Sequence, residues 1–104
     1  MKSLLIIIAM SFLILGVQAQ ARLIVGCSTQ DIEALVQAVG GKVLDTFSIA
    51  KGTQDPHQID AKPSFIVKFR KANLVVSQGL ELEAAWLDPL IRDSRNPDIA
   101  AGSK

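Results

Sequence analysis

Hydrophobic positions in residues 22–50 follow first a strand pattern, then a helix pattern, then a strand pattern again. Residues 22–27 form a short apolar run rich in β-branched side chains, which predicts a buried strand. Four apolar residues then recur at the i, i+3, i+4, i+7 spacing of an amphipathic helix: Ile32, Leu35, Val36 and Val39. The glycine pair at 40–41 predicts the end of this helix, because glycine accepts the left-handed C-cap conformation.

The two ends of this helix lead into further structure. Ser28 stands three residues before Asp31, which approximates a capping box at the helix start. Residues 42–50 are rich in strand formers, but Asp45 falls on the apolar parity, which a bulge or an exposed strand end would explain. Residues 22–50 therefore predict a compact β-α-β crossover, which is right-handed if its strands are parallel.

The pattern is less regular in the second half. Residues 51–63 contain a glycine, two prolines and several polar residues, which predicts a long loop. Residues 64–70 alternate, with Phe65, Val67 and Phe69 on one face, and predict a half-buried strand. Residues 73–78 either extend that strand or fold back as a hairpin.

A second helix is predicted after Gly79, from four residues at helical spacing: Leu82, Ala85, Trp86 and Leu90. Pro89 cannot lie deep inside a helix. Either the helix ends near Leu87, or Asp88 caps a new turn with Pro89 at its first position. Residues 93–104 have little apolar content and are predicted to be a flexible tail.

The predicted order of elements is β-α-β-β-α, with residues 98–101 as the only candidate for a final strand. We expect one α+β domain over residues 22–92. Its predicted form is a small ferredoxin-like sandwich, with two helices on one face of an antiparallel or mixed sheet.

The amino-terminal pattern predicts export. Lys2 precedes an apolar run over residues 4–16, and small residues then allow cleavage after Ala19 or Ala21. This is the layout of a secretory signal peptide over residues 1–21. The run is short for a membrane span, so we expect a secreted or periplasmic protein that leaves the membrane after cleavage.

Charge and cysteine content narrow the function. Without Lys2, ten Lys and Arg residues balance ten Asp and Glu residues. A neutral domain argues against nucleic acid and against an electrostatic membrane-surface role. The single cysteine, Cys27, excludes an intrachain disulfide. It is a buried hydrophobe, an intermolecular bridge, or a lipid attachment point after a lipobox-like Ile24-Val25-Gly26.

Candidate chemistry is sparse. A thiol enzyme would use Cys27 with His57 as its base, oriented by Asp55 or Asp60, but nothing in their spacing brings Cys27 and His57 together. Asp55, His57 and Asp60 lie within six residues and offer three metal ligands, but a turn-forming polar loop explains them better. We therefore predict no catalytic, metal or cofactor residues, and a non-enzymatic binding protein.

Residues 22–50, RLIVGCSTQDIEALVQAVGGKVLDTFSIA, resemble the opening of subtilisin propeptides, the I9 inhibitor family. The resemblance implies a ferredoxin-like inhibitor or intramolecular chaperone whose partner is a subtilisin-like protease. It implies a carboxyl-terminal tail in the protease cleft, here Asn96, Pro97, Asp98, Ile99, Ala100, Ala101, Gly102, Ser103 and Lys104. The alternative is an exported interaction module of unknown partner, self-associating through an edge strand or Cys27, or a lipoprotein or thiol enzyme using Cys27.

Overall fold

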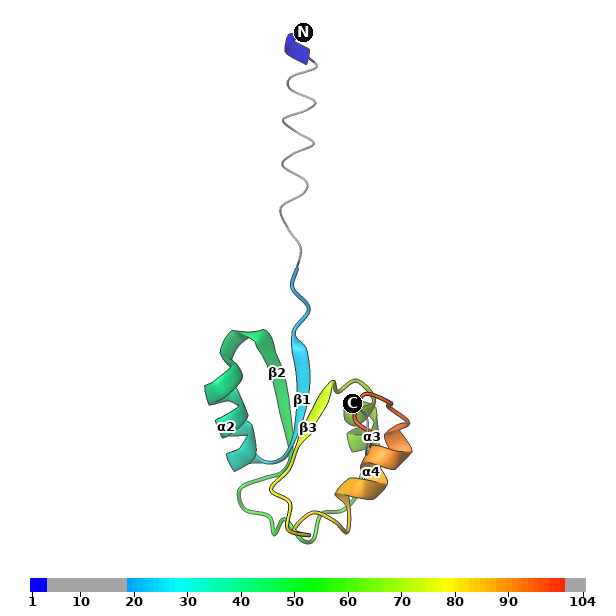
Figure 1. Cartoon of the computed structure of the whole chain (residues 1–104). Helices are drawn as coiled ribbons and strands as arrows, with labels where there is room; N and C mark the ends of the chain where they lie inside the picture. The colour runs from blue at the N-terminus through cyan, green and yellow to red at the C-terminus, as the bar shows by residue number, and fades with distance from the viewer. Residues whose placement is uncertain (4–18, 101–104) are drawn as a thin grey trace.

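The computed structural model of the chain describes residues 1–3 and 19–100. Its centre is a three-stranded sheet in the order β2-β1-β3, built from β1 (Leu23–Thr29), β2 (Leu44–Ala50) and β3 (Leu74–Val76). β1 pairs with both neighbours, and both pairings are parallel. Helix α2 lies on one side of the sheet, and α3 and α4 lie on the other (Figure 1).

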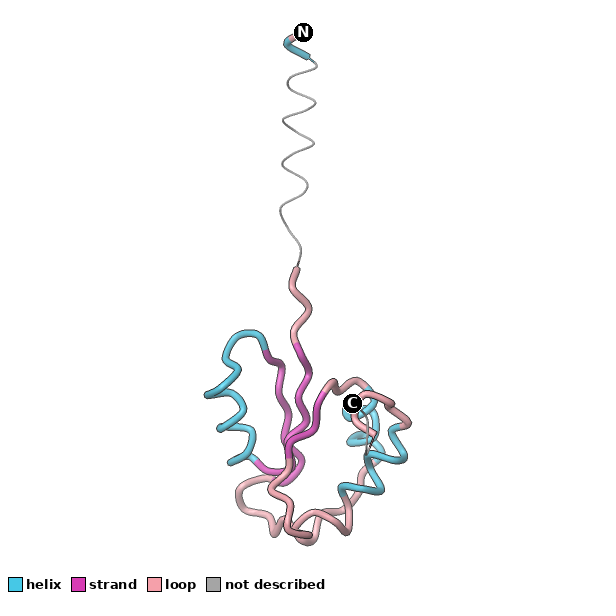
Figure 2. The backbone as a smooth tube through the Cα atoms, viewed as in Figure 1, coloured by secondary structure: helices cyan, strands magenta, loops and turns pink. Residues whose placement is uncertain are grey.

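This architecture corrects the expected fold class. The domain mixes helices and strands as predicted, but it is a parallel α/β layer structure and not a ferredoxin-like antiparallel or mixed sheet. The helices are also not gathered on one face, as the colouring by secondary structure makes clear (Figure 2). The physical reason is connectivity, since each strand is joined to the next through a helix and such crossovers produce parallel neighbours.

The first crossover forms as the pattern predicts. Helix α2 (Gln30–Gly40) connects β1 to β2, and Gly41, at φ 55°, ends it before a short 3-10 helix, η2 (Gly41–Val43). The cap differs by one residue from the prediction. Thr29, not Ser28, accepts a hydrogen bond from the backbone N–H of Ile32 at 3.3 Å. Asp45 lies exposed on β2 and forms a 3.0 Å ion pair with Arg22.

Residues expected to form the third strand form helix α3 (Pro63–Arg70). Pro63 occupies the first turn, where proline loses no intrahelical hydrogen bond. Phe65 and Ile66 are half-buried and Phe69 is fully buried, whereas Val67 is exposed. This burial follows the helical period, so the apparent alternation of Phe65, Val67 and Phe69 was misleading over so short a segment.

The end of the chain forms one more strand and one more helix. β3 neither extends the preceding segment nor forms a hairpin, because it pairs with β1. Residues 77–86 form a loop with turns at 80–86. Helix α4 (Leu87–Ser94) begins directly after Trp86 and has Pro89 in its first turn. Of the two predicted alternatives, a new helical start around Asp88 is therefore the one closer to the structure.

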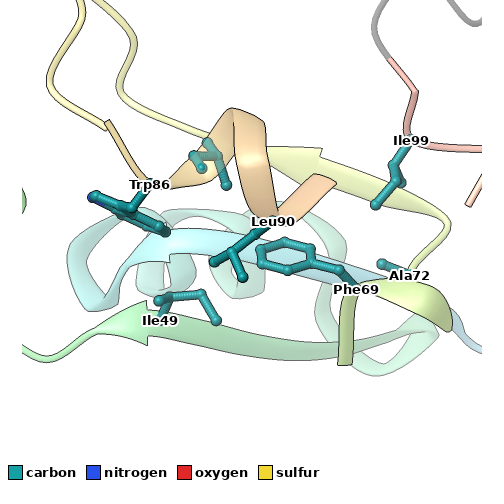
Figure 3. Close-up of a cluster of buried hydrophobic side chains, with 7 residues drawn as sticks. Ile49, Phe69, Ala72, Trp86, Leu90 and Ile99 are labelled. Carbon is teal, nitrogen blue, oxygen red and sulfur yellow. The ribbon is translucent and has the colours of Figure 1, made fainter. Parts of the chain in front are cut away.

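The main hydrophobic core lies between the sheet and the pair α3 and α4. Figure 3 shows the side chains of this cluster converging from β2, from α3 and α4, and from the segments next to these helices. Its buried members are Ile49, Phe69, Ala72, Trp86, Leu87, Leu90 and Ile99. Phe47 from β2 packs edge-on against Phe69, with ring centroids 5.5 Å apart. This core holds the carboxyl-terminal half of the chain against the sheet.

The described part of the expected tail contacts this core. Asn96 is buried, and its side-chain amide donates to the carbonyls of Phe69 at 2.8 Å and Ala72 at 2.6 Å. Ile99 is one of the core residues. Residues 101–104 lie outside the described residues, as do residues 4–18 of the predicted signal peptide. A partner-binding role for residues 96–104 stays a prediction.

Replacing Gly26 with alanine is expected to destabilise the fold by about 1–3 kcal/mol, the usual range for overpacking. A Cβ at Gly26 would lie 2.8 Å from Cζ of Phe47 and 3.0 Å from Cε1 of Phe69. Urea unfolding measures the change. Phe47→Leu in the same chain should recover part of the loss, because it makes room for the added methyl group. Equal stability of Gly26→Ala and the parent chain would contradict this packing.

Candidate functional site

Two loops meet at the carboxyl edge of the parallel sheet. Residues 51–62 follow β2 and residues 77–86 follow β3, and both lie at the lower end of the molecule in Figure 1. The indole N–H of Trp86 joins them by donating to the backbone carbonyl of Pro56 at 2.7 Å. Open α/β sheets bind ligands at this edge, beyond the carboxyl ends of their strands. This loop pair, residues 51–62 and 77–86, is therefore the candidate binding site.

His57 and Asp55 form a paired unit in the first loop. Nδ1 of His57 lies 2.9 Å from Oδ1 of Asp55, and the backbone N–H of His57 donates to the same oxygen at 2.9 Å. These two hydrogen bonds, the backbone one first, hold the pKa of the Asp55 carboxyl below its usual value. Both side chains are more than half exposed. Within the described residues the Nε2 atom of His57 has no hydrogen-bond partner.

Glu83 organises the second loop. Its buried carboxylate accepts the backbone N–H groups of Gln78 at 2.9 Å and Gly79 at 3.2 Å. These bonds fold a turn in which Leu80 and Glu81 adopt φ values of 55° and 65°, a left-handed conformation uncommon for residues other than glycine. Glu83 thus holds the turn through both of its oxygens.

The structure does not bring the proposed thiol pair together. Cys27 is fully buried within β1, whereas His57 lies in an exposed loop. Asp60 is exposed in the same loop as His57 and takes no part in the Asp55 hydrogen bonds. Across the described residues no three His, Cys, Asp or Glu side chains cluster closely enough to hold a metal ion. His57 with Asp55 is therefore the one part of the expected constellations that the fold assembles.

The thiol of Cys27 is expected to be unreactive in the folded protein. Burial, and secondarily the charge of Glu33, raises its pKa from 9.0 to about 11. Two pKa units reduce the reactive thiolate about a hundredfold near neutral pH, before any steric protection. Alkylation by iodoacetamide followed by mass spectrometry at pH 8 tests this, with the urea-unfolded chain as the fast control. Equal rates in the two states would contradict it.

Comparison with protein families shows to which family this chain belongs. The sequence profile of "ZnuA: Zinc-uptake complex component A periplasmic" matches residues 25–104. The chain belongs to this family. The match extends through both halves of the folded region, including the loops that carry His57 and Trp86. No curated protein matches the sequence.

Solved structures share the ZnuA-type fold with this chain. A crystal structure of ZnuA is 23% identical to this chain, with a TM-score of 0.67. The aligned region covers 80% of this chain and 34% of the ZnuA chain. The Mn-bound and Cd-bound periplasmic metal binding proteins from candidatus liberibacter asiaticus are each 19% identical with a TM-score of 0.63, and cover 80% of this chain and 29% of theirs. The chain thus spans about a third or less of these proteins.

The family corrects several expectations. The resemblance of residues 22–50 to I9 inhibitors is wrong, because a longer match assigns the chain to the ZnuA family and the sheet is parallel, not ferredoxin-like. The protease-inhibitor function and the subtilisin-like protease partner are wrong with it. The alternative of a self-associating module, lipoprotein or thiol enzyme is not supported either.

The expected location is confirmed, because the family is described as periplasmic. Within the described residues no helix is long and apolar enough to cross a membrane.

Sequence reasoning missed two residues of the loop pair. Trp86 was predicted only as a residue of the second helix, and its bond to Pro56 joins positions far apart in the chain. Glu83 was not singled out at all, and no local pattern marks its burial.

Proposed function

We propose that this chain is part of a periplasmic binding protein that captures a divalent transition metal ion, zinc first, and that His57 is one of the metal ligands. Family membership points to zinc uptake, and the related structures of similar fold are described as metal-binding proteins. His57 is the only histidine of the chain. Imidazole nitrogen is a preferred ligand of Zn²⁺ and of neighbouring transition metals.

The observation that carries the proposal is the 2.9 Å contact between Nδ1 of His57 and Oδ1 of Asp55. A carboxylate at Nδ1 keeps the proton there, so that Nε2 carries the free lone pair. The same contact fixes the orientation of the ring. Asp55 and His57 thus form the orienting half of a carboxylate–histidine–metal unit at the carboxyl edge of the sheet.

A single histidine does not complete a metal site. Zinc sites in proteins commonly use three or four protein ligands, and the described residues hold no cluster of three. Because the chain spans about a third of the related structures, the remaining ligands would come from polypeptide beyond the matched part. On this proposal the chain is non-enzymatic, and it passes its ion to the other components of an uptake complex.

A zinc titration followed by NMR of the imidazole nitrogens tests the proposal. We expect Zn²⁺ to shift the Nε2 resonance of His57 far more than any other side-chain nitrogen, and His57→Ala to remove the binding. Asp60→Asn is the matched control, because it removes a carboxylate from the same loop without touching His57. Zinc binding that survives His57→Ala, or a loss of the same size in Asp60→Asn, would refute this role.

A further inference from the structure

His57 lies between the two anchored residues of an otherwise exposed loop. Within residues 51–62 every residue is exposed except Pro56 and Ile59, which are half-buried. Ile59 packs against the main hydrophobic core, and the backbone carbonyl of Pro56 accepts the 2.7 Å hydrogen bond from the indole of Trp86. In the sequence, His57 is therefore flanked by one residue that a hydrogen bond ties to the core and by another that packing ties to it.

The bond to the indole is the polar link between the His57 segment and the rest of the fold. Within the described part of the chain, the other hydrogen bonds of residues 55–58 stay inside this segment, including both bonds from His57 to Asp55. A further bond joins Gly52 to the side chain of Gln30 at 2.7 Å, but it lies at the start of the loop. The orientation of the histidine relative to the sheet therefore depends strongly on the indole.

The side chain of Trp86 is itself fixed by the core and by the second loop. Its ring is buried beside Ile49 and Leu90, and its nitrogen points away from both (Figure 3). The backbone N–H of Trp86 donates to the carbonyl of Glu83 at 3.1 Å, and the Glu83 carboxylate holds the turn of that loop. A buried indole N–H needs an acceptor, and here the acceptor is the carbonyl of Pro56.

The zinc affinity of a loop histidine depends on how often the free loop has the conformation that binds the ion. The apparent dissociation constant is the intrinsic constant divided by the fraction of molecules in the competent conformation. An exposed loop that loses an anchor spreads over more conformations, so this fraction falls. A hydrogen bond of ordinary net strength changes such a fraction about three- to tenfold.

We infer that Trp86 is a positioning residue of the zinc site, because its hydrogen bond to the Pro56 carbonyl holds Asp55 and His57 in the conformation that binds the ion. Trp86 is not itself a ligand, since its side chain is buried and its one polar atom is bonded to Pro56. The inference rests on the proposed role of His57 as a zinc ligand. Because coupling between two sites is reciprocal, bound zinc should in turn strengthen the indole bond to Pro56.

Zinc titration of the 104-residue chain with Trp86→Phe tests the inference. Phenylalanine keeps an aromatic ring in the core but has no N–H donor, so we expect the dissociation constant at His57 to rise about three- to tenfold. Ile24→Ala is the control, because Ile24 packs against the same core from the amino end of β1, away from both loops. It should bind zinc like the parent chain. An equal loss in this control, or no loss in Trp86→Phe, would overturn the inference.

The indole resonance supplies a readout that a purely structural role would not change. In the parent chain we expect zinc to shift the indole N–H signal of Trp86 and to slow its exchange with solvent, both with the midpoint of the His57 titration. His57→Ala should abolish both responses. A Trp86 signal that saturating zinc leaves unchanged would overturn the inference even if Trp86→Phe binds zinc weakly, because the bond would then be uncoupled from the ion.

A second variant and the parent titration keep the outcomes distinct. If Trp86→Phe does not fold, a synthetic chain with Trp86→3-benzothienylalanine replaces it, because sulfur then takes the place of the indole N–H in a ring of nearly the same shape. Absence of a zinc shift at Nε2 of His57 in the parent chain refutes zinc binding, and the positioning role falls with it. Equal zinc binding by the parent and by the variant without the N–H refutes the role of Trp86 alone.

Discussion

Replacing Trp86 with alanine is expected to lower the free energy of unfolding by about 3–5 kcal/mol, the usual cost of truncating a buried aromatic residue. The Trp86 side chain is 3% exposed and lies in the core cluster with Ile49 and Leu90 (Figure 3). Truncation also removes the indole N–H that donates to the carbonyl of Pro56 at 2.7 Å. Urea unfolding monitored by far-UV circular dichroism measures the loss, since the substitution removes the only tryptophan.

Trp86→Phe separates the two effects. Phenylalanine keeps most of the apolar contact but has no N–H, so we expect a smaller loss, with about 1 kcal/mol from the hydrogen bond. Amide exchange in residues 51–62 should accelerate in Trp86→Phe, because the loop loses its link to the second loop. Unchanged exchange at His57 would show that the bond to Pro56 does not hold the loop. An alanine variant as stable as the parent would contradict the core assignment.

Replacing Asp55 with asparagine is expected to weaken zinc binding at His57 by about ten- to a hundredfold, the usual effect of removing a carboxylate behind a metal-ligating histidine. Asparagine keeps the shape of the side chain but has no charge, so its contact with Nδ1 of His57 is no longer that of a carboxylate. Dissociation constants from the NMR titration measure the change. Asp60→Asn should bind zinc like the parent chain. If Asp55→Asn does so as well, Asp55 only shapes the turn.

Acidification gives a second view of the same pair. Hydrogen bonds from His57 lower the pKa of Asp55 in the folded chain relative to the unfolded one. The ionised carboxyl therefore contributes stability above its unfolded pKa, and that contribution disappears as the pH falls through the lower folded value. Asp55→Asn should remove this acid-side dependence from the unfolding curve, and Asp60→Asn should retain it. The Asp55 pKa is measurable by NMR titration of the carboxyl carbon.

The sequence predicted the first crossover because its signals are local. Gly40 and Gly41 end the helix, and the stripe from Ile32 to Val39 has a clear period. It did not predict helix α3, because Phe65 and Phe69 satisfy a period of 2 and a period of 3.6 equally well over eight residues. Pro63, read as a loop residue, was the helix start that distinguishes the two. The error at α3 then made the sheet look antiparallel.

The candidate site could be predicted only in part from the sequence. Asp55 and His57 stand two residues apart, so their turn is a local feature, and both were singled out as candidate ligands. They were not predicted as metal ligands, because a turn-forming polar loop explained them better. The bond from Trp86 to Pro56 and the burial of Glu83 arise only when distant loops meet, which no spacing along the chain reveals. The exposure of Leu35 and Val39 on α2 is likewise decided by how the helix packs on the sheet, which periodicity alone did not predict.

The strand at the centre of the sheet is the first to be synthesised. β1 hydrogen-bonds to residues 44–50 and to residues 74–76, so neither of its edges is satisfied until those later segments have arrived. Contacts between such distant positions slow folding. During export, β1 would enter the periplasm with both edges open, and the nascent chain would be most exposed to aggregation and proteolysis until β3 had followed it across.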